Sequence, residues 1–381
     1  MKIGVNARML IKPYTGIGQH TRYLFRELAK IDKSNEYLLV VPEEISGEVK
    51  SDFPSNLRVE ILPESKMGTK GMNKTFWEQV MVPEFFRSKN VDIAYFTYPS
   101  NPWAKNWYKG AGKTVLTIHD CIPWKDKKYR RGLFSKMYHG KTRKACNKVD
   151  KIITVSETSK MDIMDFCGID SGKIEVIYND AADIFKTQVD NGFLKKVLEG
   201  YGIISYKYFL YCGGYDMRKN VRFLLKNYSE YCEKAAHPYP LVLVGDQLYK
   251  DKLYEDFNTK FSSDRGKIIN TGFIDETELK ALYSGCRAFV HLSKEEGFNI
   301  PLIEAVNCGA PLIISDIPVH REIAGDGAKY LNLNDESCAA NTMLKFNDSM
   351  RAHYAKLSSD ISKKYSWQKS AQKLKDVLSL L

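Results

Sequence analysis

Two glutamates eight positions apart, Glu296 and Glu304, give the strongest chemical signal in the sequence. They lie in the run EGFNIPLIE, between a strand-like segment (288–292) and a helix-like one. Pro301 suits the first helical position, because its missing N–H costs nothing there. Backbone amides at such a helix start bind anions or polyols. Here they belong to Gly297, Phe298, Asn299 and Ile300. The carboxylates can therefore address two parts of one ligand, although either glutamate could also be a simple first-turn residue.

A second candidate site is the run CGGYDMRKN, which follows the strand-like segment 208–212. Gly214 lets the backbone turn tightly. Arg218 supplies a forked donor and Lys219 a compact ammonium, and these side chains bind diphosphates. The run is not a P-loop, because G-x-x-x-x-G-K-[ST] does not occur. An Arg–Lys pair is also common on protein surfaces, so the interpretation depends on where the fold places it.

Two further candidates lie in the first half of the chain. His119 ends the apolar strand-like segment 114–118 in the run TIHD, where a buried core histidine is the alternative interpretation. Gly16 and Gly18 follow the first strand and open a helix. Thr21 stands where the dinucleotide fingerprint has its third glycine, so the sequence does not favour dinucleotide binding.

Strand-like and helix-like segments, which must position these residues, alternate along the chain. Short apolar runs predict strands, and longer stretches with helical spacing separate them. The strand-like runs are 3–5, 37–41, 59–62, 93–98, 114–118, 152–155 and 175–178 in the first half, and 208–212, 241–244, 267–269, 288–292, 312–314 and 329–331 in the second. The first half also predicts helices at 18–29, 75–87, 134–148 and 157–167.

This alternation predicts βαβ units and parallel sheets. The expected fold class is α/β, with two doubly wound Rossmann-like domains facing each other across a cleft. Turn residues at 179–183 separate the two series. We expect an N-terminal domain over 1–182, a C-terminal domain over 183–365, and a helix over 366–381 that packs back toward the N-terminal domain. Ligands bind outside the carboxyl ends of strands in such sheets, and all four candidate runs follow strands.

Length and composition exclude several classes of protein. The 381 residues are enough for two domains. No apolar run is long enough to span a membrane, and the N-terminus lacks the apolar region of a signal peptide. Eight scattered cysteines, with no C-x-x-C, favour buried thiols of a cytoplasmic protein over disulfides or a metal site.

The charge is uneven. Of the net +11, residues 1–180 hold +9, from 30 basic and 21 acidic residues. Segment 121–148 contains ten basic residues and one acidic residue. Aromatic side chains, Trp124, Phe134 and Tyr138, are interleaved with them. The segment is typical of docking to an anionic membrane surface, and its alternative is a solvated helix face. The proposed docking cations are Lys127, Lys128, Arg130 and Arg131, which would make the protein peripheral at the inner face of the membrane.

The sequence resembles the retaining family-4 glycosyltransferases of the GT-B fold, within the group 1 glycosyltransferases, and is mannosyltransferase-like. The resemblance rests on the runs EGFNIPLIE, CGGYDMRKN and TIHD, and on TGIGQHTRYLFREL near the N-terminus. The resemblance covers nearly the whole chain. It implies a nucleotide-diphosphate-sugar donor held mainly by the second domain and an acceptor held mainly by the first. The sequence departs from the family pattern at Met217, where the family usually has Pro. It departs again at Asn299, because the family's glutamate-containing run usually reads GFGLP. The crossover, usually Asn-Gly-Val-Asp, reads NDAAD here.

The resemblance also implies residue roles. Arg218 and Lys219 would neutralise the donor diphosphate, which Gly16, Gly18 and Gly214 would approach. Glu296 would contact the transferred sugar, which His119 would line from the other side, and Glu304 would bind the ribose. Gly297 to Ile300 would hold sugar and phosphate oxygens.

The expected function is transfer of a hexose to a glycan or lipid-linked acceptor in surface polysaccharide biosynthesis. GDP-mannose is the first expectation for the donor, and a UDP-sugar is the alternative. No D-x-D occurs, so we expect catalysis without metal or cofactor. Two other functions stay open: a nucleotide-sugar 2-epimerase, and a non-catalytic protein that binds a nucleotide sugar or a polyanion. No recognised nucleic-acid-binding motif accompanies the basic segment, and no feature predicts an oligomeric state.

Overall fold

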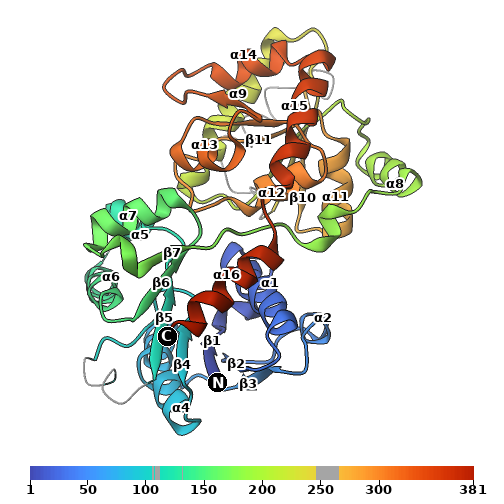
Figure 1. The fold of residues 1–381 in the computed structure, drawn as a ribbon. Helices are drawn as coiled ribbons and strands as arrows, with labels where there is room; N and C mark the ends of the chain where they lie inside the picture. Colours follow the sequence, from blue (N-terminus) through green and yellow to red (C-terminus); the bar gives the residue numbers. More distant parts are fainter. Residues whose placement is uncertain (105–106, 108–111, 131, 246–265) are drawn as a thin grey trace. The chain divides into compact units, whose positions relative to one another are not determined.

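The computed structural model describes residues 1–104, 107, 112–130, 132–245 and 266–381, without the side chains of Arg130 and Phe134. The chain forms two compact units. Unit 1 comprises Met1–Asn179 and Ser366–Leu381, and unit 2 comprises Asp180–Tyr365. Each unit is built around its own parallel sheet (Figure 1).

Unit 1 contains, in its described part, a seven-stranded sheet of order β3-β2-β1-β4-β5-β6-β7. All of its strand pairs are parallel. The strands are β1 (Lys2–Asn6), β2 (Glu36–Val41), β3 (Leu57–Ile61), β4 (Ile93–Phe96), β5 (Lys113–Thr117), β6 (Lys151–Thr154) and β7 (Ile174–Val176). The chain runs outward from β1 to β3 and then returns to the other side of β1 at β4, so β1 and β4 flank the point where the strand order reverses.

Helices of unit 1 pack against this sheet (Figure 1). They are α1 (Gly16–Ile31), α2 (Gly47–Ser51), α3 (Lys70–Phe76), α4 (Val82–Ser88), α5 (Ile122–Lys125), α6 (Leu133–Cys146), α7 (Glu157–Cys167) and α16 (Trp367–Ser379). Short turns are η1 (Arg8–Ile11), η2 (Trp77–Met81), η4 (Lys127–Arg130) and η5 (Ser171–Lys173). The C-terminal helix α16 lies along α1, where Trp367 packs on the rings of His20 and Tyr23 at 6.3 and 5.9 Å.

Unit 2 has, among its described residues, a six-stranded sheet of order β10-β9-β8-β11-β12-β13. Its strands are β8 (Phe209–Cys212), β9 (Leu241–Val244), β10 (Ile268–Gly272), β11 (Ala288–His291), β12 (Leu312–Ser315) and β13 (Ala328–Leu331). Its helices are η6 (Asp183–Lys186), α8 (Asn191–Tyr201), η7 (Met217–Lys219), α9 (Val221–Lys234), α11 (Glu276–Gly285), α12 (Ile300–Asn307), α13 (Pro318–Ala324), α14 (Cys338–Lys345) and α15 (Asp348–Ser362). Here the strand order reverses between β8 and β11.

The predicted α/β fold class is confirmed, and each of the strand-like runs overlaps a strand. The stretch 75–87, expected as a helix, is helical throughout. A π-helical turn, η2, interrupts its α-helical hydrogen bonding between α3 and α4. All eight cysteines are free thiols, and seven of them are buried. Within the described residues, no helix has both the length and the apolar character needed to cross a bilayer.

Candidate active site

The two loops that carry the strongest sequence signals meet at the carboxyl edge of the unit 2 sheet. The loop with Arg218 and Lys219 follows β8, and the loop with Glu296 follows β11. The two strands are hydrogen-bonded neighbours, with Phe209 opposite Ala288. A further backbone bond of 2.8 Å, from Lys294 N to Arg218 O, ties the loops together. This is the strand-order reversal, where open α/β sheets bind ligands.

The Glu296 carboxylate lies at the centre of this site, with 4% of its side chain exposed. Arg218 Nη1 donates to Oε2 at 2.5 Å, and Lys219 Nζ donates to Oε1 at 2.7 Å. Ser293 Oγ and His291 Nε2 also donate to Oε1, at 2.7 and 3.2 Å. Two cations thus surround one buried anion, and the cations keep partial access to solvent, with 28% and 12% of their side chains exposed.

The Glu296 carboxylate is kept ionised by the charged and polar groups around it. Burial by itself raises the pKa of Glu296, but Lys219, the His291 hydrogen bond and Arg218 together bring that pKa well below its usual value. Burial lowers the pKa of His291 to about 4, although its bond to Glu296 acts in the opposite direction. The site therefore holds an ionised carboxylate beside a neutral imidazole at neutral pH.

The loop from Gly297 to α12 is held by unusual backbone geometry. Asn299 has φ +86°, a left-handed conformation that L-residues other than Asn and Asp rarely adopt. Its Nδ2 donates to His320 Nε2 at 3.0 Å, and His320 Nδ1 donates to Ser315 O at 3.0 Å. Phe298 turns inward and packs on Tyr365 at 5.5 Å. The resembling family usually has glycine at this position, and Asn299 keeps the backbone conformation that glycine adopts easily.

Glu304 lies on α12 and is buried, in contrast to an ordinary first-turn glutamate. Its Oε2 accepts a hydrogen bond from Tyr283 Oη at 3.1 Å. Gly214 is exposed in the loop after β8, and a Cβ there would meet nothing within 4 Å. No group of three or more His, Cys, Asp or Glu that could hold a metal ion occurs in the part of the chain that is described.

His119 belongs to unit 1, at the carboxyl end of β5. Its Nε2 donates to Thr97 O at 2.9 Å, which leaves Nδ1 as the acceptor nitrogen. Its ring meets the edge of His20 at 4.8 Å. Burial, with a smaller contribution from His20, lowers the pKa of His119 to about 3. His119 is thus a neutral hydrogen-bond acceptor.

Gly16 and Gly18 open α1, but they differ in role. Gly16 is exposed and has nothing within 4 Å of a Cβ position. Gly18 is buried, and a Cβ there would lie 2.2 Å from the Lys12 carbonyl oxygen. Gly18 is therefore required by the packing of its own loop, whereas a side chain at Gly16 would meet open space.

The strand-order reversal of unit 1 holds a polar cluster that the sequence interpretation missed. Glu78, in the π turn η2, is fully buried. It accepts hydrogen bonds from Tyr98 Oη at 2.7 Å and Tyr138 Oη at 3.1 Å, and Lys74 Nζ lies 3.5 Å away. Tyr98 follows β4, one residue after the carbonyl that His119 contacts. A lone glutamate within a helical stretch carried no signal for this role.

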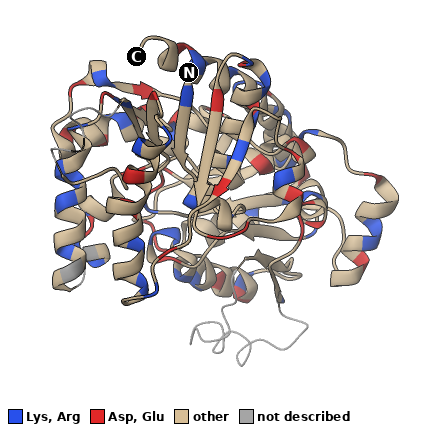
Figure 2. Ribbon diagram, turned by 90° about the horizontal axis from the view of Figure 1, so that it is seen from below, with Lys and Arg blue, Asp and Glu red and all other residues tan. Residues whose placement is uncertain are grey.

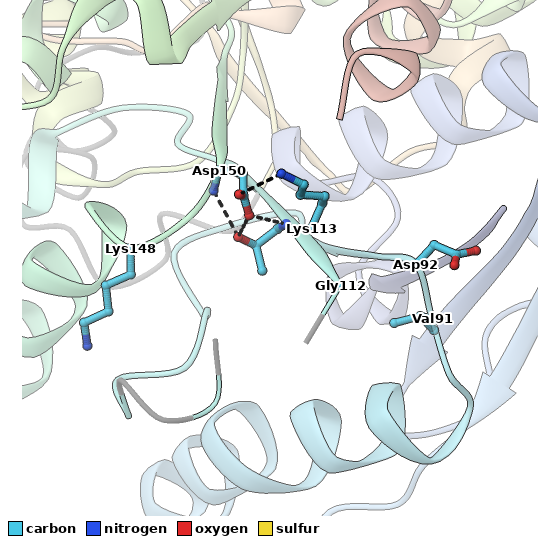
Figure 3. A pocket seen from close by; sticks show the side chains of 7 residues that line it. Val91, Asp92, Gly112, Lys113, Lys148 and Asp150 are labelled. Atoms are coloured by element: carbon cyan, nitrogen blue, oxygen red, sulfur yellow. Dashed lines mark hydrogen bonds and ion pairs between the residues drawn. The ribbon is translucent and has the colours of Figure 1, made fainter. Parts of the chain in front are cut away.

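One hollow of unit 1 lies away from these residues. About 560 Å³ in volume, it is at the amino ends of β4 and β5 (Figure 3). Its polar groups bind one another: Thr114 N and Oγ1 donate to Asp150 Oδ2 at 2.8 and 2.6 Å, and Lys113 pairs with the same carboxylate at 3.7 Å. The candidate residues lie at the opposite edge of the sheet, so this hollow is not part of the site.

The comparisons agree with this geometry. Residues 14–179 match the family model described as Glycosyltransferase Family 4, and residues 203–351 match the one described as Glycosyl transferases group 1. The chain is a group 1 glycosyltransferase. It is 24% identical to O-antigen chain mannosyltransferase B of Escherichia coli over 97% of each chain. It is 33% identical over 224 residues to O-antigen chain mannosyltransferase RfbU of Salmonella typhimurium, over 58% of this chain and 57% of the relative.

Solved structures show that this glycosyltransferase has the GT-B fold. Anabaena HepE, solved in complex with UDP-glucose, superposes with a TM-score of 0.75 at 18% identity over 100% of both chains. WaaG, a glycosyltransferase involved in lipopolysaccharide biosynthesis, gives 0.74 at 13% identity over 99% of both chains. The predicted family and fold are therefore confirmed.

In the basic segment 121–148 of the glycosyltransferase, the structure corrects the expected position of two aromatic side chains. The sequence predicts Trp124 and Tyr138 among the cations of a docking surface, but Trp124 is 6% exposed in the core and Tyr138 bonds Glu78. Among the described side chains of α6, the exposed large apolar ones are Leu133, at 87%, and Met137, at 43%. Lys127 and Lys128 are exposed as expected. Arg131 and the side chains of Arg130 and Phe134 lie outside the described residues. Figure 2 shows Lys and Arg in blue along helices on the left, the side on which Figure 1 labels α6.

Proposed function

We propose that the protein is a retaining glycosyltransferase that transfers a hexose from a nucleotide-diphosphate sugar to a glycan or lipid-linked acceptor in surface polysaccharide biosynthesis. GDP-mannose is the proposed donor, because the two relatives named above are O-antigen mannosyltransferases. A UDP-sugar is the alternative, since HepE was solved with UDP-glucose. The observation that carries the proposal is the contact of Arg218 and Lys219 with Glu296 at the sheet's reversal point.

The chemistry needs stabilisation of two developing charges. Cleavage of the sugar–phosphate bond leaves negative charge on the diphosphate, which Arg218 and Lys219 would neutralise. The sugar gains positive character beside the ionised Glu296. As the diphosphate attracts the two cations, the Glu296 oxygens become available to the sugar hydroxyls. Glu304 would bind the ribose, and the amides from Gly297 to Ile300 would bind sugar and phosphate oxygens.

These cations support catalysis without a divalent metal, because they supply the charge that Mg²⁺ provides in other transferases. The test is incubation with GDP-mannose or a UDP-hexose in excess EDTA, followed by NMR of the product. Transfer with the anomeric configuration retained supports the proposal. Activity that is lost on chelation and restored by Mg²⁺ or Mn²⁺ contradicts the metal-free mechanism. A changed nucleotide sugar released without acceptor identifies a 2-epimerase instead.

For unit 1, we propose that the acceptor binds at the carboxyl edge, beside the Glu78 cluster. Burying a carboxylate is costly, so Glu78 is best explained by what it positions. Lys74 Nζ lies over the rings of Tyr98 and Tyr138 at 5.6 and 5.9 Å, and 40% of its side chain is exposed. The rings hold the ammonium in place, and its exposed N–H groups can donate to the hydroxyls of a sugar. His119, with its acceptor Nδ1, and Gly16 keep their proposed roles at the donor sugar and diphosphate.

We further propose that unit 1 docks on an anionic membrane at the cytoplasmic face. Lys127 and Lys128 supply charge, each contributing about 1 kcal/mol near such a surface. Leu133 and Met137 supply the apolar contact. Neutralising Lys127, Lys128, Arg130 and Arg131 together should release the protein from anionic vesicles and slow transfer to a lipid-linked acceptor, with little change on a short soluble acceptor. Equal vesicle binding by wild type and variant contradicts the docking proposal.

A further inference from the structure

A small basic hollow lies in unit 1, apart from the candidate active site. Its volume is about 250 Å³. One wall is Trp124, at the end of α5, and the other is the helix α6. The lining residues from α6 are Lys136, His139, Gly140, Arg143 and Lys144. In the described part of the chain, none of the lining residues is acidic.

The spacing places these residues on one side of the helix. Positions 136, 139, 140, 143 and 144 follow the three- and four-residue steps that align side chains along a helix face. Gly140 stands in the middle of the row, and a Cβ there would meet nothing within 4 Å. The row therefore has a gap at its centre, with cationic side chains at both ends.

The cations of this row are not neutralised by described residues. Lys136, Arg143 and Lys144 are exposed, and no described carboxylate forms an ion pair with any of them. Lys125, on the neighbouring α5, differs, because both of its bonds to the Asp162 carboxylate are 3.1 Å long. Like charges gathered without counter-charges repel one another, and an anion in the hollow removes that repulsion.

We propose that this hollow binds a phosphate group, held by Lys136, Arg143 and Lys144. A guanidinium fork matches phosphate geometry, and lysines add charge to the same oxygens. The phosphate belongs either to a lipid headgroup or to a free phosphate ion. The site is separate from the transferase chemistry, so its test does not depend on the proposed function.

The first experiment titrates the full chain with inorganic phosphate, followed by calorimetry. The variant Arg143→Ala/Lys144→Ala removes two cations from the hollow. Its matched control, Lys127→Ala/Lys128→Ala, removes two exposed cations of the same segment that do not line the hollow. We expect the phosphate Kd to rise at least about tenfold in the first variant and to stay unchanged in the control.

The second experiment measures cosedimentation with vesicles that contain phosphatidylglycerol, and with phosphatidylcholine vesicles for comparison. A lipid headgroup in the hollow predicts that Arg143→Ala/Lys144→Ala loses more binding than Lys127→Ala/Lys128→Ala, although both lose the same charge. A free phosphate ligand predicts equal vesicle losses, with the difference confined to inorganic phosphate. The proposal is overturned if the two variants behave alike with both probes, or if wild type binds neither. Thermal melting of each variant verifies that it is folded.

Discussion

Lys219 Nζ donates a 2.7 Å hydrogen bond to Glu296 Oε1, so a cation proposed to bind the donor is held by the carboxylate proposed to contact the sugar. Arg218 makes the matching contact with Oε2 at 2.5 Å. The pairing arises because β8 and β11 are neighbours in the sheet while their loops are far apart in sequence. It means that the diphosphate must compete with Glu296 for both cations.

The first prediction follows from that competition. Glu296→Gln keeps the shape of the side chain and removes its charge, so Arg218 and Lys219 are freed for the diphosphate. We expect GDP to bind up to about tenfold more tightly, while kcat falls at least about 100-fold, because transition-state charge is no longer stabilised. Calorimetry with GDP and initial rates with GDP-mannose measure the two effects separately.

Glu304→Gln is the comparison for this variant. It should weaken GDP binding by about 1.5–3 kcal/mol, the worth of a hydrogen bond to a charged group. If Glu296→Gln weakened GDP binding as much as Glu304→Gln does, the proposed division of roles between the two glutamates would be wrong.

Much of this architecture was predictable from the sequence. Buried parallel strands are short continuous apolar runs, and each predicted run overlaps a strand. The Glu296 and Arg218 loops were predictable because glycines, a proline and charges follow two of those runs. Their mutual contact was not, since it depends on strand order, which apolar runs do not encode.

Other features had no signal in the sequence. Glu78 is one of many glutamates in a helical pattern, and only the π turn and the strand-order reversal make it the centre of a cluster. Trp124 looked like an exposed aromatic among lysines, because composition does not say which side of a four-residue helix faces the core.

The second prediction concerns pH. Burial lowers the pKa of His20 from 6.5 to about 4, although its bond to Asn179 acts in the opposite direction. Between these values the unfolded chain binds a proton that the folded chain does not, so stability is full above pH 6.5 and is lost as the pH falls toward 4. One such histidine contributes a slope of about 1.4 kcal/mol per pH unit.

His20→Gln should reduce the slope of the unfolding free energy against pH by the contribution of one proton. This holds whatever effect the substitution has on stability at neutral pH. Urea unfolding of both proteins at several pH values between 6.5 and 4.5 measures the slopes. Because the pKa of Glu296 lies well below its usual value, its own contribution is lost only at lower pH and does not confuse the comparison. Identical slopes for wild type and variant would show that His20 is protonated alike in both states.

The third prediction tests the acceptor edge. Lys74→Ala removes the ammonium above Tyr98 and Tyr138, and Glu78→Gln weakens the bonds that hold the two phenols. With a synthetic mannose-terminated trisaccharide as acceptor probe, we expect its KM to rise about five- to tenfold in each variant. Slow hydrolysis of GDP-mannose without acceptor should be unchanged.

Lys70→Ala is the matched control, because Lys70 is exposed on the same helix as Lys74. Its acceptor KM should equal that of wild type. A loss of donor hydrolysis in Lys74→Ala would place that residue at the donor, and equal KM values in all three variants would remove the acceptor from this edge.

The last prediction concerns Asn299, whose φ of +86° costs most residues about 1 kcal/mol or more. Asn tolerates this conformation and adds the 3.0 Å bond from its Nδ2 to His320. Asn299→Gly keeps the backbone free of strain but loses that bond, at a cost of about 1 kcal/mol. Asn299→Ala loses the same bond and adds strain, so it should cost about 2 kcal/mol. Urea unfolding should therefore rank wild type above Gly and Gly above Ala. Ala is ordinarily the more stabilising of the two in helices. An Ala variant more stable than the Gly variant would mean that the loop leaves the left-handed conformation at Asn299.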